Sequence, residues 1–382
     1  METKKYRFDE VTINFDKKRI PLSSAQREKR QGTFRYYGAQ GVIDHVDDYI
    51  YDGTYLLIAE DGENLKSKKQ NIAQVVDGQF WVNNHAHIVQ GNEQCDTRFL
   101  CYLINSMDLS GYVTGSAQPK LSQANLNAIT LSLPTLVEQK RIVEYLYMLD
   151  QKIDVNRQIN DNLQQQAAAL FESWFVNYDP WDGVQPSEWE NAPLGSFVEI
   201  KRGGSPRPIQ DFLSDSGLRW LKISDVTSLS SPFVLEIKEH IKEEGLRKTV
   251  FLHAGELVLS NSATPGIPKI LDVDTCIHDG WLYFPKSELS KYYLYLFFKH
   301  IRKELVALGN GSVFTNLKTD ILKAFPATKA DESTLKEFDA LVTPLFDAML
   351  NADRENFKLA AMRDALLPKL MSSEIDVSEV EL

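Results

Sequence analysis

The sequence has no long hydrophobic run and little cysteine. No stretch of its 382 residues approaches the roughly 18 consecutive apolar residues of a transmembrane helix, and the opening METKKYRFDE lacks the apolar core of a signal peptide. Its three cysteines are Cys95, Cys101 and Cys276, an odd number without metal-ligand spacing. We therefore expect a cytoplasmic protein with no membrane segment, no disulfide framework and no zinc knuckle.

Signatures of catalysis are also missing. The sequence contains no Gly-rich phosphate loop followed by Lys-Ser/Thr and no Gly-x-Ser-x-Gly nucleophile elbow. It lacks the Asn/Asp-Pro-Pro-aromatic stretch of amino-methyltransferases, because the nearest match, DPW at 179–181, has a single proline. ATP turnover, serine-based hydrolysis and methyl transfer by this chain itself are therefore not expected.

Two short matches to catalytic or metal sites carry little weight. The EIK of Glu199–Lys201, with Asp182 upstream, fits a nuclease pattern, but so short a match arises by chance and EIK recurs at 236–238. His85 and His87 could begin a metal site, yet no cysteine or acidic residue stands at ligand spacing. We predict no catalytic residue, metal or cofactor in this chain, which favours a binding or scaffolding subunit.

The formal net charge of −11 is unevenly distributed. Residues 1–134 carry 15 basic and 16 acidic side chains, and residues 183–330 carry 18 and 17. The excess acidity lies in 135–182 and 331–382. The two long blocks are nearly neutral, so basic faces that bind nucleic acid remain compatible with the composition.

A phrase recurs in the chain at a constant offset of 196 residues. GSAQPKLSQANLNAI occupies 115–129 and GSVFTNLKTDILKAF occupies 311–325, with Gly-Ser, two leucines and an alanine at matching places. Such a repeat indicates a duplicated structural unit. We expect the shared residues to be structural and the differing residues, 118–120 and 314–316, to contact the ligand.

A helical pattern follows each copy of the phrase. Residues 138–175 lack glycine and proline and have apolar residues alternately four and three apart, which predicts a coiled-coil helix of about 50 Å. The second segment has the same phase, although Pro344 predicts a helix start, kink or break and Pro368 the end of the last turn. Two unrelated long helices are the alternative. The predicted antiparallel seam comprises Ile142, Leu146, Leu149, Ile153, Asn160, Leu163 and Leu170 with Met349, Asn356, Leu359, Leu366 and Leu370.

The long blocks are predicted to be rich in short strands. Six β-prone runs are bounded by Gly, Asp, Asn or Pro, and apolar helices are expected at 97–107 and 291–305; the runs span 55–61, 80–90, 196–202, 218–224, 255–261 and 280–286. We predict an α+β fold in which two similar α/β domains are separated by two long antiparallel coiled-coil helices, with an internal pseudo-twofold repeat. The expected segments are 1–134, 135–178, 179–330 and 331–382.

Loops of both domains carry side chains suited to DNA. Arg and Lys bind phosphates or guanine edges, and Asn and Gln pair with adenine, although most basic clusters are simply solvated surface. The candidate DNA-binding residues are Arg27, Lys29, Arg30, Arg35, Tyr36, Tyr37, Gln40, Lys66, Lys68, Lys69, Gln118 and Lys120 in the first domain, and Lys201, Arg202, Ser205, Arg207, Lys222, Asn261, Thr264, Lys269, Thr315, Asn316 and Lys318 in the second.

With these features the sequence resembles the specificity subunits of type I restriction–modification enzymes over essentially its whole length. The likeness is carried by residues 36–64, 115–154 and 170–175 of the first half and by 198–208, 220–226 and 355–375 of the second. FDALVTPLFDAM in the second half departs from the Glu-Gln form of the first, so the second helix is identified mainly by its end.

The resemblance implies that 1–134 and 179–330 are target recognition domains, each binding one half of a split double-stranded DNA sequence, and that 135–178 and 331–382 are spacer helices. It further implies that the chain is a non-catalytic subunit acting in phage defence. Two modification (methyltransferase) subunits would supply S-adenosylmethionine and methylate adenine, and restriction subunits that use ATP and Mg²⁺ can join. The DNA target itself is not encoded in any motif of the sequence.

Two other functions fit the residues less well. A coiled-coil adaptor could use the repeated domains to bind protein or glycan, and exchanging a domain would then change nothing on DNA. An enzyme of unrecognised type would turn over a substrate alone, whereas a specificity subunit supports methylation only together with a partner.

Overall fold

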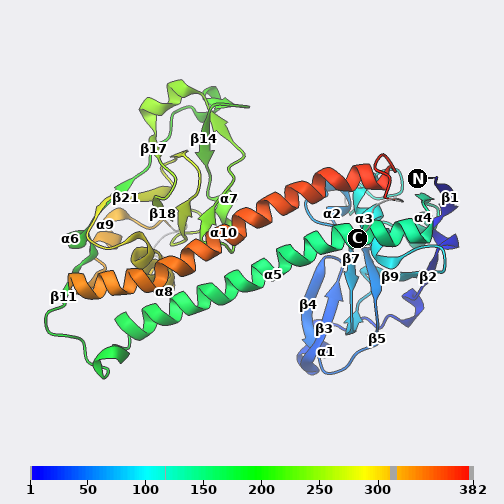
Figure 1. The fold of residues 1–382 in the computed structure, drawn as a ribbon, viewed down its shortest axis with the longest axis horizontal. Coiled ribbons are helices and arrows are strands. Elements are labelled where there is room, and N and C mark those ends of the chain that lie inside the picture. The colour runs from blue at the N-terminus through cyan, green and yellow to red at the C-terminus, as the bar shows by residue number, and fades with distance from the viewer. Residues whose placement is uncertain (1, 117, 310–315, 378–382) are drawn as a thin grey trace. The chain divides into compact units, whose positions relative to one another are not determined.

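The computed structural model describes residues 2–116, 118–309 and 316–377. The chain forms two compact units (Figure 1). The first unit comprises 1–151 with 359–382, and the second comprises 152–358. Each unit therefore contains part of both long helices. In the predicted division of the chain, by contrast, each long helix is a segment of its own, separate from the two domains. The segment boundaries of the recognition domains stay a prediction.

The first unit contains two small sheets, whose strands are drawn in blue and cyan in Figure 1. In the antiparallel sheet the strand order is β2 (Thr12–Asn14), β9 (Ala86–Gly91), β6 (Tyr55–Ala59) and β7 (Ala73–Val76). In the mixed sheet it is β4 (Gly41–Val46), β3 (Gln31–Gly38), β8 (Gln79–Val82) and β5 (Tyr51–Asp52). A separate ribbon pairs β1 (Lys4–Arg7) with β10 (Thr130–Leu133). The helices are α1 (Ser24–Glu28), α2 (Asn64–Ser67), α3 (Thr97–Ser106) and α4 (Gln123–Asn127).

The second unit repeats this construction. Its first sheet has the order β12 (Val198–Arg202), β21 (Trp281–Ser287), β18 (Leu257–Ser260), β19 (Pro268–Leu271) and β15 (Phe233–Val234). Its second sheet has the order β13 (Leu213–Ser214), β16 (His240–Ile241), β14 (Leu218–Leu221), β20 (Thr275–Ile277) and β17 (Val250–Leu252). β11 (Glu190–Pro193) pairs with β22 (Pro326–Lys329), as β1 does with β10. The helices are α6 (Leu194–Phe197), α7 (Ser224–Thr227), α8 (Lys291–Gly309) and α9 (Thr319–Lys323).

Strand direction confirms that the two units are copies of one fold. Each mixed sheet contains a parallel pair, β3 with β8 and β14 with β20, flanked by antiparallel neighbours. Phe80 of β8 and Cys276 of β20 hold the same place in these pairs and differ by the repeat offset of 196 residues. The predicted α+β fold with two similar α/β domains and an internal repeat is confirmed. The expected single strand at 80–90 is wrong, because the turn at residues 83–85 divides it between two sheets.

Both long helices are 40 residues long, α5 over Leu136–Phe175 and α10 over Glu332–Met371. Their first turns are capped at equivalent repeat positions. Thr135 precedes α5 and exchanges hydrogen bonds with Glu138, while the Asp331 carboxylate accepts from the amides of Ser333 and Thr334. Such caps satisfy backbone donors that a helix leaves unpaired. The helix start or break expected at Pro344 is wrong, since α10 continues through it, whereas a kink there stays a prediction.

The long helices run antiparallel within each unit. In the second unit, Asn156 donates to Asn356 at 2.9 Å and Asn160 donates to Asp353 at 2.8 Å. The contacting residue of α10 therefore comes earlier in the chain as that of α5 comes later, which shows that the helices are antiparallel. In the first unit, Asp150 accepts from Arg363 at 2.8 Å. Among the predicted seam residues, Ile142, Leu146, Ile153, Asn160, Met349 and Leu370 are buried, whereas Leu149, Leu163, Leu170, Asn356, Leu359 and Leu366 are half-buried.

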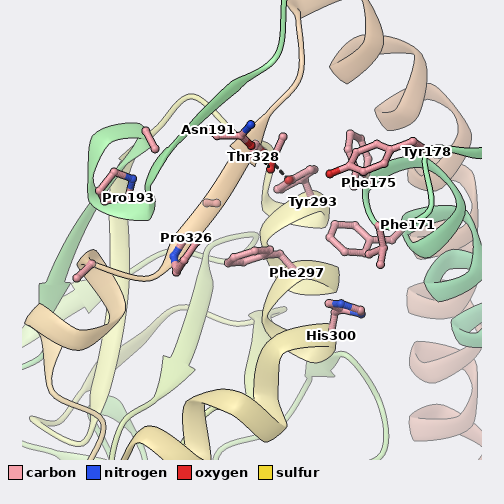
Figure 2. A pocket seen from close by; sticks show the side chains of 14 residues that line it. Phe171, Phe175, Tyr178, Asn191, Pro193, Tyr293, Phe297, His300, Pro326 and Thr328 are labelled. Carbon is pink, nitrogen blue, oxygen red and sulfur yellow. Dashed lines mark hydrogen bonds between the residues drawn. The ribbon is translucent and has the colours of Figure 1, made fainter. Parts of the chain in front are cut away.

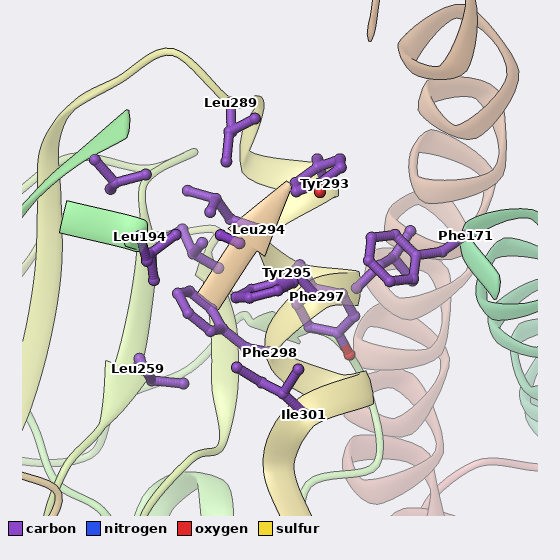
Figure 3. Packing of buried hydrophobic residues seen from close by; sticks show 14 of the residues in the cluster. Phe171, Leu194, Leu259, Leu289, Tyr293, Leu294, Tyr295, Phe297, Phe298 and Ile301 are labelled. Atoms are coloured by element: carbon purple, nitrogen blue, oxygen red, sulfur yellow. The ribbon is translucent and has the colours of Figure 1, made fainter. Parts of the chain in front are cut away.

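The core of the second unit joins helices to sheet. Phe171 and Phe175 of α5 pack with Tyr293 of α8, and Phe298 on the same helix lies among Leu194 and Leu259 (Figure 3). Large aromatic side chains contribute most of the area buried at such contacts. Phe338, Val342 and Phe346 of α10 belong to the same cluster, so the core of this unit includes side chains of both long helices.

Candidate nucleic-acid interface

The repeated phrase docks against the end of strand β6 in the first unit. The Leu121 amide donates to the Glu60 carbonyl at 2.8 Å, and the Gly62 amide donates to the Pro119 carbonyl at 3.1 Å. Leu121 is fully buried, as expected for a structural position of the phrase. Gly115 adopts a φ of +84°, and a β-carbon there would lie 2.2 Å from the Gln118 carbonyl oxygen, which explains the glycine.

Four predicted DNA-binding residues lie on or beside the docked phrase, and we call them the first loop cluster: Gln40, Lys66, Gln118 and Lys120. Gln40 belongs to it because its Nε2 lies beside Gly62, whose amide donates to the phrase. All four are exposed. Lys66 Nζ donates to the Ser116 carbonyl at 3.1 Å, and Lys120 Nζ lies 3.3 Å from the Glu60 carboxylate. The cluster thus combines two cations with two amides, the groups that bind phosphates and base edges.

A buried histidine, His87, contacts the backbone of the repeated phrase and helps to hold it in place. His87 is 1% exposed; its Nδ1 lies 2.7 Å from Asp16 Oδ2 and its Nε2 lies 2.8 Å from the Leu121 carbonyl. Burial acts to raise the pKa of Asp16, but hydrogen bonds from His87 and the Ile88 amide outweigh it and lower that pKa. His85 is separately paired with Asp61 at 2.7 Å. The two histidines therefore have different carboxylate partners and do not converge on a common point.

The same docking occurs in the second unit. The Leu317 amide donates to the Asn261 carbonyl at 2.7 Å, and Leu317 is buried. Its neighbours Asn316 and Lys318 are exposed. Thr315, also predicted to bind DNA, lies outside the described residues. The phrase therefore presents side chains beside the end of β18, as it does beside the end of β6.

In the second unit, three predicted residues of the loop at 201–208 contact the same residue, Asp279. We call these three residues, Arg202, Ser205 and Arg207, the second loop cluster. Ser205 Oγ donates to Asp279 Oδ1 at 2.6 Å, and Arg207 Nη2 donates to Asp279 Oδ2 at 3.1 Å. Arg202 Nε donates to the Asp279 carbonyl. The hydrogen bond from Ser205, assisted by the charges of Arg202 and Arg207, lowers the pKa of Asp279 although burial opposes this.

A pocket of about 860 Å³ lies beside the second loop cluster. Its lining includes Arg207, Trp220, Lys222, Ser262 and His278. Burial lowers the pKa of His278, so its ring is neutral near pH 7, while Lys222 is paired with a glutamate, Glu239. Lys201 is likewise paired, with Glu199 at 2.9 Å, which is the ordinary ion pair behind the EIK match.

Four predicted DNA contacts are wrong because the side chains are buried: Tyr36, Tyr37, Asn261 and Lys269. Tyr36 and Tyr37 belong to the central strand β3, where they pack in the core of the first unit. Lys269 of β19 donates to the carbonyls of Leu229 and Ser231, and burial lowers its pKa to about 7.

The other predicted residues do not belong to the two loop clusters, and several have partners of their own. Arg27 and Arg30 are paired with Asp44 and Asp47, and Arg35 donates to the Asp77 carbonyl. Lys68 donates to the Met107 carbonyl. The remaining predicted residues are Lys29 and Lys69, which are exposed, and Thr264, which is half-buried.

A further pocket in the second unit differs in character (Figure 2). It has a volume of about 610 Å³ and is lined by Phe171 and Phe175 of α5, Tyr293 and Phe297 of α8, and residues of β11 and β22 such as Pro326. Its lining contains no lysine or arginine. Aromatic walls without a cation do not suit a polyanion, so this pocket is not part of the candidate interface.

Comparison with known proteins decides the family. The family model of the type I restriction modification DNA specificity domain matches residues 2–165 and 186–328, one match in each repeat. The chain belongs to this family. Specificity subunits of type I restriction enzymes are non-catalytic, and catalysis lies in other subunits of the complex. None of the helices in the described part of the chain is long and apolar enough to cross a membrane.

Individual members of the specificity family are similar along most of this chain. A Haemophilus influenzae protein assigned as a type I restriction enzyme specificity subunit is 26% identical over 366 residues, covering 92% of this chain and 89% of its own. The MjaIX specificity subunit of Methanocaldococcus jannaschii is 24% identical, covering 74% and 70%. The crystal structure of a type I system S subunit from M. genitalium shares the fold with a TM-score of 0.66 at 14% identity, covering 97% and 96%.

The residues that organise the loops of this specificity subunit escaped prediction. Asp279, Glu60 and His87 hold the loop clusters in place, yet none was among the candidate DNA-binding residues. A signal was present for Asp279, which stands one repeat offset from Asn83 in the same turn between strands. Where the two repeats have different residues at an equivalent turn, as with Asn83 and Asp279, the difference indicates that the two units bind different ligands.

Proposed function

We propose that this chain recognises a double-stranded DNA sequence in two parts, with one repeat for each part. The observation that carries the proposal is that the phrase docks in the same way in both units but presents Gln118 and Lys120 in one and Asn316 and Lys318 in the other. A shared frame with different exposed side chains suits two half-sites of different sequence. Recognition would use major-groove base edges together with phosphate contacts.

We further propose that the helix pair carries two modification subunits. Val155, Ile159 and Phe357 expose apolar surface on the long helices of the second unit, at 48%, 45% and 49% exposure. Exposed apolar residues along a helix favour contact with partner helices. An internal repeat can bind two copies of one partner in equivalent ways.

The partners would supply the chemistry in a cytoplasmic complex. S-adenosylmethionine would be bound by the modification subunits, which methylate adenine, and ATP and Mg²⁺ would serve restriction subunits where these join. A flipped adenine would enter the modification subunit, because enzymes that act on a base take it out of the stack.

The decisive experiment expresses this chain with its modification subunit in cells that lack adenine methylation and then maps N6-methyladenine by sequencing. We expect methylation at one split sequence with a fixed gap, and none when either subunit is omitted. Scattered methylation without a consensus sequence would argue against recognition by this chain and in favour of an adaptor that binds protein or glycan.

Removing one exposed cation should weaken DNA binding without affecting the fold. Lys69→Ala is expected to reduce the affinity of the assembled complex and to lower the slope of log K against log salt by about 1, because one phosphate contact is lost. Filter binding at several salt concentrations measures this slope.

Arg30→Ala serves as the comparison for Lys69→Ala. The Arg30 guanidinium lies 2.9 Å from Asp47 and 4.8 Å from the centroid of the Trp81 ring, so its loss should lower the unfolding midpoint and leave the salt slope unchanged. An unchanged slope in Lys69→Ala would remove that residue from the interface.

A further inference from the structure

Asp279 organises the most exposed arginine of the second loop cluster. The Arg207 side chain is 77% exposed, yet its Nη2 donates to Asp279 Oδ2 at 3.1 Å. Its Nε and Nη1 make no hydrogen bond to any other described residue. One edge of the guanidinium is thus held by the carboxylate, while the remaining donors stay available to a ligand.

The same carboxylate is itself rigidly held. Ser205 donates to Asp279 Oδ1 at 2.6 Å and the Asp279 amide lies 3.3 Å from Ser205 Oγ, so the two residues are joined twice. Arg202 Nη2 lies 3.8 Å from Asp279 Oδ2, and its Nε donates to the Asp279 carbonyl. Arg207 is therefore tethered to a fixed point rather than moving freely on a loop.

The geometry of this group suits a base edge. Arg202 and Arg207 carry two positive charges and Asp279 carries one negative charge close to both, so one net positive charge remains. Asp279 also fixes the direction of the free Arg207 donors, and a neutral base edge is bound through such oriented hydrogen bonds. Guanine presents two adjacent acceptors, O6 and N7, in the major groove, and the planar fork of arginine matches them.

The first unit lacks this arrangement at the equivalent turn. One repeat offset before Asp279 stands Asn83, which is 7% exposed and accepts from the His85 amide at 2.8 Å. No hydrogen bond joins Asn83 to an arginine side chain among the described residues. Arg19 does donate to the Ala86 carbonyl beside this turn, but its side chain is only 15% exposed. Of these two turns, as far as they are described, only that of the second unit holds an exposed arginine through a carboxylate.

We propose that Asp279 positions Arg207 to recognise a guanine in the half-site bound by the second unit. The proposal rests on the proposed function and adds to it the identity of one base and the positioning residue behind its recognition. It predicts that one half of the methylated sequence, and not the other, has a guanine requirement that depends on both residues.

The test compares methylated sequences of cells that express the modification subunit with the wild-type chain, Asp279→Asn or Arg207→Lys. Both variants should lower the preference for guanine at one position of one half-site by about 10-fold to 100-fold, the range of a lost bidentate contact. The other half-site should be unchanged. Arg207→Lys changes only an exposed side chain, so it also tests the proposal if Asp279→Asn fails to fold.

Asp272→Asn is the matched control, because it removes an aspartate–arginine pair of the same unit, with Arg354 at 2.6 Å. It should leave the methylated sequence unaltered. Three results would overturn the proposal: a half-site pair without such a guanine, an unchanged guanine requirement in both variants, or equal loss of methylation at all sequences, which marks a phosphate contact. Absence of any split consensus with the wild-type chain would instead overturn the proposed function, and this inference with it.

Discussion

Exchanging residues 179–330 for the corresponding segment of a related specificity subunit is expected to replace one half of the methylated sequence completely and to leave the other half intact. The second unit has its own two sheets and its own hydrophobic core, so its loops can change without altering the first unit. Specific sites are bound typically 10³-fold to 10⁷-fold more tightly than non-specific DNA, so the switch should be all-or-none. Sequencing of N6-methyladenine in cells with the modification subunit measures it.

The reciprocal exchange of residues 1–134 is the control for this experiment. It should change the opposite half-site, and the gap between the halves should stay the same in both chimaeras because neither exchange alters α5 or α10. Both halves changing at once, or neither, would contradict the assignment of one half-site to each repeat. An adaptor that binds protein or glycan would give no change on DNA.

Local patterns in the sequence were sufficient for the long helices and for the repeat. A heptad pattern depends on neighbouring residues along one helix, so α5 and α10 could be predicted without knowledge of their partners. The start or break expected at Pro344 was wrong because proline usually interrupts a helix. It lies on the exposed side of α10, where the carbonyl that loses its partner can be hydrated.

The candidate site was harder to predict because burial depends on distant partners. Tyr36 and Tyr37 stand in a stretch rich in arginine and glutamine, but the strand that contains them pairs with β8 more than 40 residues later and becomes central. Lys269 likewise occupies a strand whose other residues are buried, and its ammonium donates to two carbonyls of the loop before β15. Neither the pairing of β3 with β8 nor the contacts of Lys269 can be predicted from the residues next to them in the sequence.

Asp279 is the opposite case, a residue of the candidate site that the sequence analysis did not predict. An acidic residue is not a usual candidate for contact with DNA, so a search for cations and amides passes over it. Its role arises from the approach of the loop at 201–208 to the turn between β20 and β21, which is a contact across more than 70 residues. Only the comparison of the two repeats, with Asn83 at the equivalent turn, would have drawn attention to it.

The largest effect on stability is expected from Phe338→Ala, which should lower the free energy of unfolding by about 3–5 kcal/mol. Phe338 of α10 is fully buried in the core of the second unit. Its ring centroid lies 4.8 Å from that of Phe175 and 5.8 Å from that of Trp174, so the substitution leaves a cavity between the two long helices and α8. Urea unfolding followed by tryptophan fluorescence measures the shift.

Phe357→Ala isolates the contribution of burial in this experiment. It removes the same atoms from the same helix, but Phe357 is 49% exposed, so the expected change is within about 0.5 kcal/mol. Equal shifts in the two variants would show that the helix pair does not bury Phe338. If Phe357→Ala leaves the isolated chain unchanged, as expected, and also weakens its complex with the modification subunits, the exposed apolar side of α10 is where a partner binds. In that case the two phenylalanines of α10 have different roles. Phe338, which faces the core, stabilises the second unit, and Phe357, which faces outward, binds the partner.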